Sequence, residues 1–200
     1  GKNLTEEQDL TAKFWDCNPI HSFHFGHMAF KTRQISPAGH WMNIAKIVAM
    51  KQGRGMMETL EAYALTSVAI SDGFLSCWTE KFKHNMIRPV TYINRYMDSS
   101  WNPVLQTPPF PDHSSGHATI SGAAAVVLTK VFGAVPFDDD TEVYLNMPVR
   151  TFPNFMEASY DAALSRLYGG IHVRHSNKSG TKNGIQIAEH LLEKVKTRAN

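Results

Sequence analysis

The sequence predicts an all-α protein built as one helical bundle, and two observations carry this prediction. Apolar residues recur at the three- and four-residue spacings of amphipathic helices in several segments, and strict alternation over a strand length is hard to find. The chain has 200 residues and is 42% hydrophobic, which is enough to bury one core. We therefore expect a single domain over residues 1–200, and we leave open that it is the C-terminal part of a longer chain.

Five helices are expected in chain order, over residues 41–48, 57–78, 119–132, 155–168 and 185–195. The first follows a helix-breaking segment, Pro37-Ala38-Gly39, and the second keeps apolar residues at spacings of three, four and seven. The third is rich in Ala and Val and ends at Gly133, and the fourth ends at Gly169-Gly170, because glycine often follows a helix C-terminus. The fifth has one apolar face. The Pro-rich connections 98–114 and 133–153 are long enough to suggest a functional role.

Composition excludes several classes of protein. Lys and Arg number 20 and Asp and Glu 18, so the net charge of +2 gives no argument for a nucleic-acid partner, which usually needs a pronounced basic face. The best uncharged runs, 62–71 and 118–129, are shorter than the ~20 apolar residues that span a bilayer, so no membrane span is expected. Cys17 and Cys77 can form one disulfide or none. We expect a soluble protein whose compartment and oligomeric state stay open, with secretion and the periplasm as options.

The first candidate segment contains Lys81 and Arg88. They lie seven residues apart, or two helical turns, so on one helix they share a face with Trp78. Pro89 disfavours helical geometry at Arg88 and so places this cation at the helix end, where it suits the helix dipole. Because this helix face is apolar at Trp78 and cationic at Lys81 and Arg88, it favours a buried anion pocket. A solvated pair whose aliphatic stems cover the core is the alternative.

The second segment is Ser114-Ser115-Gly116-His117, which leads directly into an apolar helix. Serine is a favoured N-cap, and the free N–H groups of a helix start bind anions. Gly116 lets a ligand approach the backbone closely, and His117 in the first turn is expected to face the same anion. An ordinary N-cap with an exposed histidine is the alternative.

In the third segment, Arg166 falls in the last turn of its helix, and Gly169-Gly170 reverse the chain and bring His172 back. A capped helix with a spare histidine is the alternative. Together the three segments supply three cations, two neutral donors and two imidazoles, which suit an oxyanion and acid–base or nucleophilic chemistry. The members of this set are Lys81, Arg88, Arg166, Ser115, the Gly116 amide, His117 and His172.

The three segments read KFKHNMIRP (81–89), FPDHSSGH (110–117) and SRLYGGIH (165–172). In this order and spacing they resemble the three-part motif of the vanadium-dependent haloperoxidases and the related acid phosphatases of the type 2 phosphatidic acid phosphatase superfamily. The resemblance covers roughly residues 10–195. It implies an all-helical bundle, in agreement with the apolar periodicity.

The resemblance also implies a role for each motif residue. Lys81, Arg88 and Arg166 are expected to bind the equatorial oxygens of vanadate or phosphate, with Ser115 and the Gly116 amide completing the cradle. His117 is the expected acid–base residue. His172 is the expected axial ligand of vanadium in a peroxidase, or the phosphorylated nucleophile in a phosphatase. Five-coordinate vanadate has the shape and charge of a phosphoryl-transfer transition state, so one site suits both.

The sequence departs from the family pattern at two positions. Ser114 stands where many members have Pro, and Ser176 stands where many have an Asp four residues after the third-motif histidine. A carboxylate there orients the imidazole, and its loss is expected to lower the basicity of His172. Glu157 and Asp161 are the alternatives that we consider for this carboxylate.

Two aromatic residues favour the peroxidase branch. Trp78 and Phe110 match positions that resemble the wall of the halide pocket in chloroperoxidase-type members, with plain core packing as the alternative. His21, His24 and His27 stand three residues apart, and we interpret them as structural rather than as a metal site.

The sequence-based hypothesis is therefore a vanadate-dependent peroxidase that oxidises bromide or chloride with hydrogen peroxide, with Lys81 polarising the bound peroxide. Phosphate is expected to compete for the same site. The alternatives are an acid phosphatase that acts on phosphate esters through a phosphohistidine, and a protein that binds phosphate without turnover.

Overall fold

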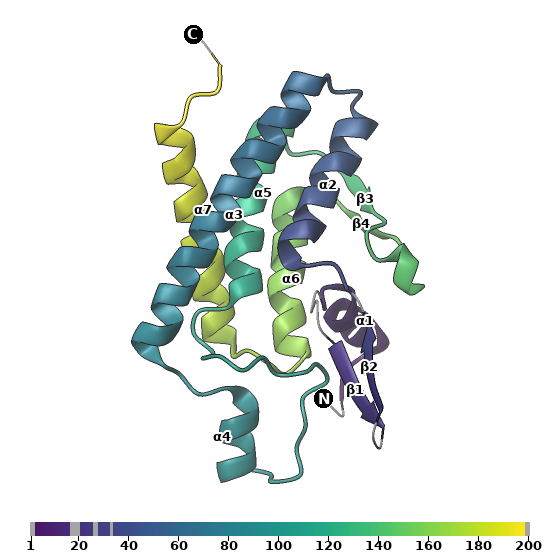
Figure 1. Cartoon of the computed structure of the whole chain (residues 1–200), viewed down its shortest axis with the longest axis vertical. Helices are drawn as coiled ribbons and strands as arrows, with labels where there is room; N and C mark the ends of the chain where they lie inside the picture. Colours follow the sequence, from purple (N-terminus) through teal and green to yellow (C-terminus); the bar gives the residue numbers. More distant parts are fainter. Residues whose placement is uncertain (1–2, 17–20, 26–27, 33, 199–200) are drawn as a thin grey trace.

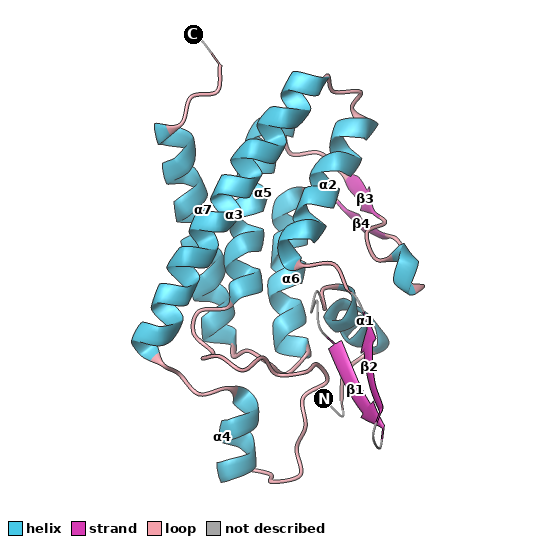
Figure 2. Ribbon diagram, in the orientation of Figure 1, coloured by secondary structure: helices cyan, strands magenta, loops and turns pink. Residues whose placement is uncertain are grey.

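The computed structural model describes residues 3–16, 21–25, 28–32 and 34–198. Its helices and strands form a helical bundle with two small hairpins (Figures 1 and 2). In chain order the elements are α1 (Glu6–Phe14), β1 (His21–Phe25), β2 (Met28–Thr32), α2 (Pro37–Lys51), α3 (Met56–His84), α4 (Pro89–Tyr96), α5 (Gly116–Phe132), β3 (Phe137–Asp139), η1 (Val143–Leu145), β4 (Arg150–Phe152), α6 (Phe155–Tyr168) and α7 (Arg174–Lys194).

The predicted fold class is confirmed, and all five predicted helices are present as α2, α3, α5, α6 and α7. The expected helix-breaking segment 37–39 is instead the first turn of α2, because Ser36 caps the helix and proline is tolerated at its first position. Two further helices, α1 and α4, and the hairpins were not predicted. The hairpin β3–β4 lies inside the predicted connection 133–153, and its three-residue strands are too short to show a period.

Helix α5 occupies the centre of the bundle and packs against α2, α3, α6 and α7. Its sequence explains this position, because Lys130 is its only formally charged residue and its Ala, Val and Leu side chains are apolar on every face. A helix that is apolar all round must be buried on all sides. The N-terminal end of α5 and the C-terminal ends of α3 and α6 point to the same end of the molecule (Figure 1).

The contact between α5 and α7 is unusually close because glycine faces the neighbouring backbone. A Cβ atom at Gly184 would overlap the Thr119 carbonyl oxygen, and one at Gly180 would lie 2.7 Å from the Ser115 carbonyl oxygen. The backbone N–H of Ser115 in turn donates to the Ser176 carbonyl oxygen at 3.1 Å. This packing fixes the start of α5 against the start of α7.

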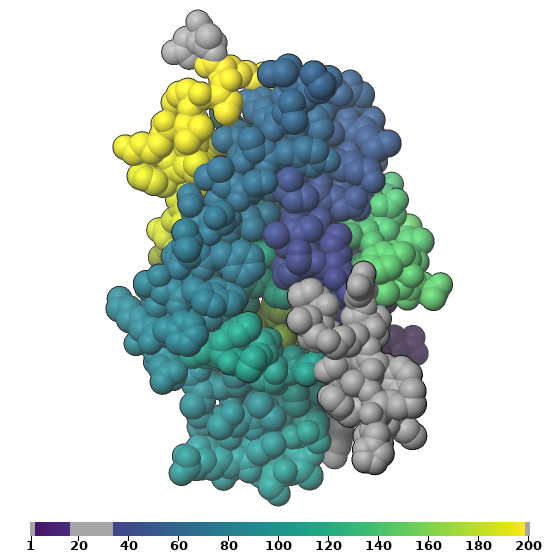
Figure 3. Space-filling model, in the orientation of Figure 1, coloured from purple at the N-terminus to yellow at the C-terminus, as the bar shows by residue number. Residues whose placement is uncertain are grey.

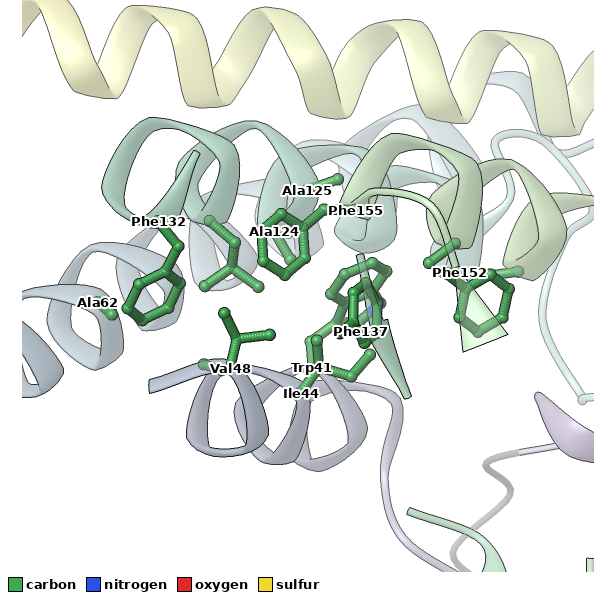
Figure 4. Packing of buried hydrophobic residues seen from close by; sticks show 14 of the residues in the cluster. Trp41, Ile44, Val48, Ala62, Ala124, Ala125, Phe132, Phe137, Phe152 and Phe155 are labelled. Carbon is green, nitrogen blue, oxygen red and sulfur yellow. The ribbon is translucent and has the colours of Figure 1, made fainter. Parts of the chain in front are cut away.

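The largest apolar cluster lies where α2, α5, α6 and the β3–β4 hairpin meet (Figure 4). Trp41, Ile44 and Val48 supply the face of α2 that the sequence predicts. Phe137 and Phe152, which pair in the hairpin register, reach the same cluster. Full burial of such side chains contributes about 1.5–3 kcal/mol each, so the hairpin closes the core at this side.

Among the described residues, no helix has both the length and the apolar character that crossing a membrane requires. Cys77 is a free, buried thiol that donates to the Ser114 carbonyl oxygen at 3.3 Å. Cys17 and the side chains of His21, His24 and His27 lie outside the described residues.

Candidate active site

The three predicted segments converge at one end of the bundle. The C-terminal end of α3, the connection that leads into α5 and the turn that follows α6 all lie at the lower end in Figure 1. The connection before α5 crosses beneath the helix ends, and its backbone carbonyls accept hydrogen bonds from the cations of the first segment. Residues that are far apart in the sequence therefore come within hydrogen-bonding distance here.

Lys81 is fully buried, so the buried alternative for the first segment is correct and the solvated one is wrong. Its Nζ donates to the carbonyl oxygens of Pro111 at 2.8 Å and Asp112 at 3.1 Å. Burial lowers the pKa of Lys81 to about 8, and the nearby Arg88 charge acts in the same direction. The site therefore contains an ammonium group that titrates close to neutral pH.

Arg88 is buried as predicted, but its position relative to the helices differs from the prediction. Helix α3 ends at His84, Asn85 adopts a left-handed conformation with φ of 48°, and Arg88 is the N-cap residue of α4. The cation therefore lies at the start of a helix, and the expected stabilisation by a helix C-terminus is wrong. The shared helical face is also wrong, because the chain leaves the helix between Lys81 and Arg88.

The contacts of the Arg88 guanidinium replace that expected stabilisation. Nε donates to the Phe110 carbonyl oxygen at 2.8 Å, and Nη1 donates to the Ile171 carbonyl oxygen at 2.7 Å and to Nε2 of His172 at 3.1 Å. Nη2 is buried and has no hydrogen-bond partner among the described residues. Arg88 thus joins the second and third segments and keeps one donor for a ligand.

The carboxylate that orients His172 comes from Asp112, a residue that the sequence reasoning missed. Oδ1 of Asp112 lies 2.9 Å from Nδ1 of His172, and its Oδ2 accepts a hydrogen bond from Ser176. Ser176 thus stands where many family members have an Asp, and its hydroxyl donates to Asp112, whose carboxylate takes the place of that Asp beside His172. A signal was present in the sequence, because Asp112 stands inside the second motif, but only the fold places it against a residue of the third.

Neither of the two carboxylates proposed from the sequence contacts His172, so the expectation that one of them orients this histidine is wrong. Asp161 accepts a hydrogen bond from Trp15 Nε1 at 2.9 Å and pairs with Arg150 at 3.3 Å. Glu157 is exposed in the first turn of α6. Both lie on α6, whose C-terminal turn alone reaches the site.

The protonation of His172 follows from its burial and from three charged neighbours. Burial lowers its pKa to about 3, with Arg88 and Lys81 acting in the same direction and Asp112 opposing them. Burial raises the pKa of Asp112, but the hydrogen bonds and charge of His172, together with Ser176 and Arg88, outweigh this and lower it. At neutral pH His172 is therefore neutral, with its proton on Nδ1 facing a carboxylate and its lone pair on Nε2.

Helix α5 begins where the second segment predicts a helix start. Ser115 is the N-cap, yet its side chain makes no capping hydrogen bond, and its Oγ is buried without a partner in the described part of the chain. Nε2 of His117 is likewise buried and unpartnered. Because Nε2 is buried, the exposed alternative is wrong. Burial lowers the pKa of His117 well below its usual value, with Arg166 and His172 acting in the same direction.

Arg166 lies in the last turn of α6, as predicted, and is almost completely buried. Its Nη2 donates to the Trp15 carbonyl oxygen at 2.5 Å and to the Ala12 carbonyl oxygen at 3.2 Å. These contacts tie the guanidinium to α1, a helix that the periodicity did not reveal. Its sequence signal was the capping box formed by Thr5 and Gln8.

The turn after α6 explains how His172 reaches the site. Gly170 has a positive φ of 73°, and a Cβ atom at Gly169 would lie 2.6 Å from Leu105. The backbone N–H groups of Ile171 and His172 both donate to the Arg166 carbonyl oxygen at 3.2 Å. The predicted chain reversal at the two glycines is therefore confirmed.

Trp78 and Phe110 lie together beside the cations. Their ring centroids are 5.1 Å apart, and Nζ of Lys81 lies 5.1 Å from the Phe110 centroid and 5.8 Å from the Trp78 centroid. The Arg88 guanidinium carbon lies 5.0 Å from the same Phe110 ring. Both rings are partly exposed, so they border the site rather than fill the core.

The unpartnered polar atoms of this site, two donors and one imidazole nitrogen, fit a bound oxyanion. Arg88 Nη2, Ser115 Oγ and His117 Nε2 are buried polar atoms without protein partners among the described residues. Such atoms cost about 1–3 kcal/mol each when they stay unsatisfied. An anion with several oxygens would satisfy them while neutralising the cations, so the residues present fit vanadate or phosphate.

Comparison with known proteins agrees with this arrangement. Residues 61–200 match the family model described as the VCPO second helical-bundle domain. The vanadium chloroperoxidase of Curvularia inaequalis is 22% identical over 164 residues, which cover 56% of this chain and 27% of that protein.

Two solved structures are also similar. The first bacterial vanadium-dependent iodoperoxidase has a TM-score of 0.87 and 48% identity, covering 96% of this chain and 44% of that one. The holo-type bacterial vanadium-dependent chloroperoxidase has a TM-score of 0.70 and 16% identity, covering 96% of this chain and 44% of that one, and shares the fold. The chain thus spans less than half the length of each of these relatives.

Proposed function

The chain belongs to the family of the VCPO second helical-bundle domain, among the vanadium haloperoxidases, and from this premise we propose that its site binds vanadate and oxidises a halide with hydrogen peroxide. The observation that carries the proposal is the state of His172. Asp112 lies against its Nδ1, so the lone pair is on Nε2, where it accepts a hydrogen bond from Arg88 Nη1. Coordination of a metal by Nε2 would replace that hydrogen bond.

In this proposal the cations bind the anion and His172 is the vanadium ligand. Lys81, Arg88 and Arg166 balance the negative charge of the oxygens, and the Ser115 hydroxyl and Gly116 amide donate hydrogen bonds at the start of α5. The unpartnered donors of Arg88 and Ser115 support these roles. When bound, vanadate supplies the centre at which hydrogen peroxide is activated towards the halide.

His117 is assigned the proton transfers. Its pKa is well lowered by burial and by nearby Arg166 and His172, so the free protein holds it neutral and able to accept a proton at Nε2. A bound anion would offset the surrounding positive charge and raise this pKa towards the range in which a histidine both accepts and donates protons. Lys81, with a pKa of about 8, stays mainly protonated at neutral pH and can polarise a bound oxygen.

Trp78 and Phe110 are assigned to the halide pocket. A large, weakly hydrated halide is favoured near aromatic edges and cations, and both rings lie close to Lys81. The relative with 48% identity is named as an iodoperoxidase, so iodide is the first halide to test, followed by bromide and chloride.

The test uses metal-free protein that contains this chain. We expect iodide oxidation by hydrogen peroxide, followed by triiodide absorbance, to appear when orthovanadate is added and to be suppressed by excess inorganic phosphate, because both anions compete for one site. Trp78→Ala should reduce the rate of halide oxidation while leaving vanadate affinity nearly unchanged. A folded variant that oxidises every halide at the parent rate would remove the halide-pocket assignment.

A second arm measures hydrolysis of a chromogenic phosphate ester without vanadate. Halide oxidation that stays absent at saturating vanadate, combined with ester hydrolysis that vanadate inhibits, would overturn the peroxidase proposal in favour of a phosphatase. Saturable anion binding without either activity would indicate a binding protein instead.

A further inference from the structure

A second group of potential ligands lies beside the oxyanion site but takes no part in it. Glu80 and His84 stand four residues apart at the end of α3, and His113 comes from the connection before α5. One ligand atom from each lies within 4.8 Å of the other two. Figure 3 shows the connection before α5, in teal-green, against the end of α3 at the molecular surface.

The chemistry of this group suits a transition metal. Residues at i and i+4 share a helix face, so Glu80 and His84 present their side chains together. Two imidazole nitrogens and one carboxylate oxygen form a ligand set that zinc commonly takes, with ligand distances of about 2.0–2.2 Å. Because Nε2 of His84 already lies 2.9 Å from Oε2 of Glu80, closing the three ligands around one ion needs shifts on the order of 1 Å, within reach of two partly exposed side chains.

His113 provides a second, independent observation. Its Nδ1 is buried and has no hydrogen-bond partner within the described residues, although a polar ring atom in that position normally has one. The ring is fixed by its neighbours, because it stacks on His175 with centroids 5.3 Å apart and meets the edge of His84 at 5.3 Å. The hydrogen bond between Glu80 and His84 accounts for those two side chains without a metal, but no hydrogen bond within the described residues satisfies Nδ1 of His113.

We propose that Glu80, His84 and His113 form a binding site for a divalent first-row transition metal, with zinc as the best match. The site would be separate from the oxyanion site yet joined to it through the backbone. Glu80 precedes Lys81, and His113 follows Asp112, whose carboxylate holds His172. An ion bound here would fasten the end of α3 to the connection that carries Asp112, and it would stabilise the folded protein by mass action.

The ordinary ion pairs at this surface do not compete strongly. Nζ of Lys83 lies 4.0 Å from Glu80, at the limit of an ion pair, and its side chain is 67% exposed. Exposed pairs of this kind contribute about 0–1 kcal/mol. Lys83 can therefore move away when a cation binds Glu80.

The test is a calorimetric titration of metal-stripped protein with zinc chloride, without vanadate or peroxide, so that its outcome is independent of the proposed function. We expect one saturable site that Glu80→Gln, His84→Ala and His113→Ala each weaken by tenfold or more. His190→Ala, which removes an exposed histidine on α7, is the matched control and should bind zinc as the parent does. Zinc should also raise the melting temperature of the parent but not of the three variants.

Circular dichroism establishes that each variant is folded, which is expected because Glu80 and His84 are partly exposed. Zinc binding of unchanged affinity in all three variants would overturn the proposal and move the ion elsewhere, with His21, His24 and His27 as the next residues to substitute. An absence of saturable binding to the parent would overturn it as well.

Discussion

Replacing Asp112 with Asn tests the arrangement of the site at its most informative point. The substitution keeps the shape of the side chain and an oxygen that can still accept from Nδ1 of His172, and it removes the negative charge. Asp112 is fully buried and lies 2.9 Å from that nitrogen, so solvent does not screen the change. The variant therefore separates the charge of the carboxylate from its shape.

The size of the effect follows from exchanging a hydrogen bond with a charged acceptor for one with a neutral acceptor. A hydrogen bond to a charged group contributes about 1.5–3 kcal/mol and one between neutral groups about 0.5–1.5 kcal/mol. The difference of about 1–1.5 kcal/mol corresponds to roughly a tenfold change in an equilibrium constant. Substitution of a residue that orients a metal-binding histidine typically lowers metal affinity by about 10–100-fold. We therefore expect orthovanadate to bind the variant at least about tenfold more weakly.

The variant should also change Lys81. The charge of Asp112 raises the pKa of that lysine, so its removal should take the pKa below the value of about 8 in the parent. The deficit in anion affinity should then widen as the pH rises from 7 to 8, because less of the variant carries the ammonium form.

Isothermal titration with orthovanadate, repeated with inorganic phosphate, measures both effects in the metal-free protein. Glu157→Gln is the matched control, because it makes the same carboxylate-to-amide change at an exposed residue of α6. An Asp112→Asn variant that binds both anions like the parent would refute the assignment of Asp112. An equal loss in Glu157→Gln would show that the contact with His172 is not responsible, because the removal of a negative charge by itself favours anion binding.

Three further outcomes are expected. Phosphate affinity should fall as pH rises from 7 to 9, because the protonated form of Lys81 is lost through its pKa of about 8, and Lys81→Met should remove most of this dependence in titrations at each pH. His117→Ala should keep anion binding but lose about 10²–10⁴-fold in turnover, whereas His172→Ala should abolish turnover; equal loss of binding in both would contradict these roles. Gly184→Ala should lower the free energy of unfolding in urea by about 1–3 kcal/mol, because its Cβ would overlap the α5 backbone. Gly73→Ala, whose Cβ would meet only ordinary contacts at 3.6 Å or more, should be neutral or slightly stabilising.

Several features of the site were determined by the sequence because they depend on short-range chemistry. A serine before an apolar run predicts a helix start, and two glycines after an amphipathic run predict a chain reversal, and both are present at Ser115 and Gly169-Gly170. The five long helices could be predicted for the same reason, since their apolar periods are local. The sequence alone therefore identified the residues of the three motifs, but not the contacts that they make with one another.

The tertiary structure alone decided which residues of different segments meet. Asp112 and Ser176 stand 64 positions apart, and they form their hydrogen bond because the glycines of α7 let its start approach the start of α5. Arg88 left the helical face predicted for it because Asn85 turns the chain, and its new hydrogen-bond partners lie in the second and third motifs. Such pairings depend on the packing of whole helices against one another, and no local pattern of residue types encodes the distance between two segments that become neighbours only when the core forms.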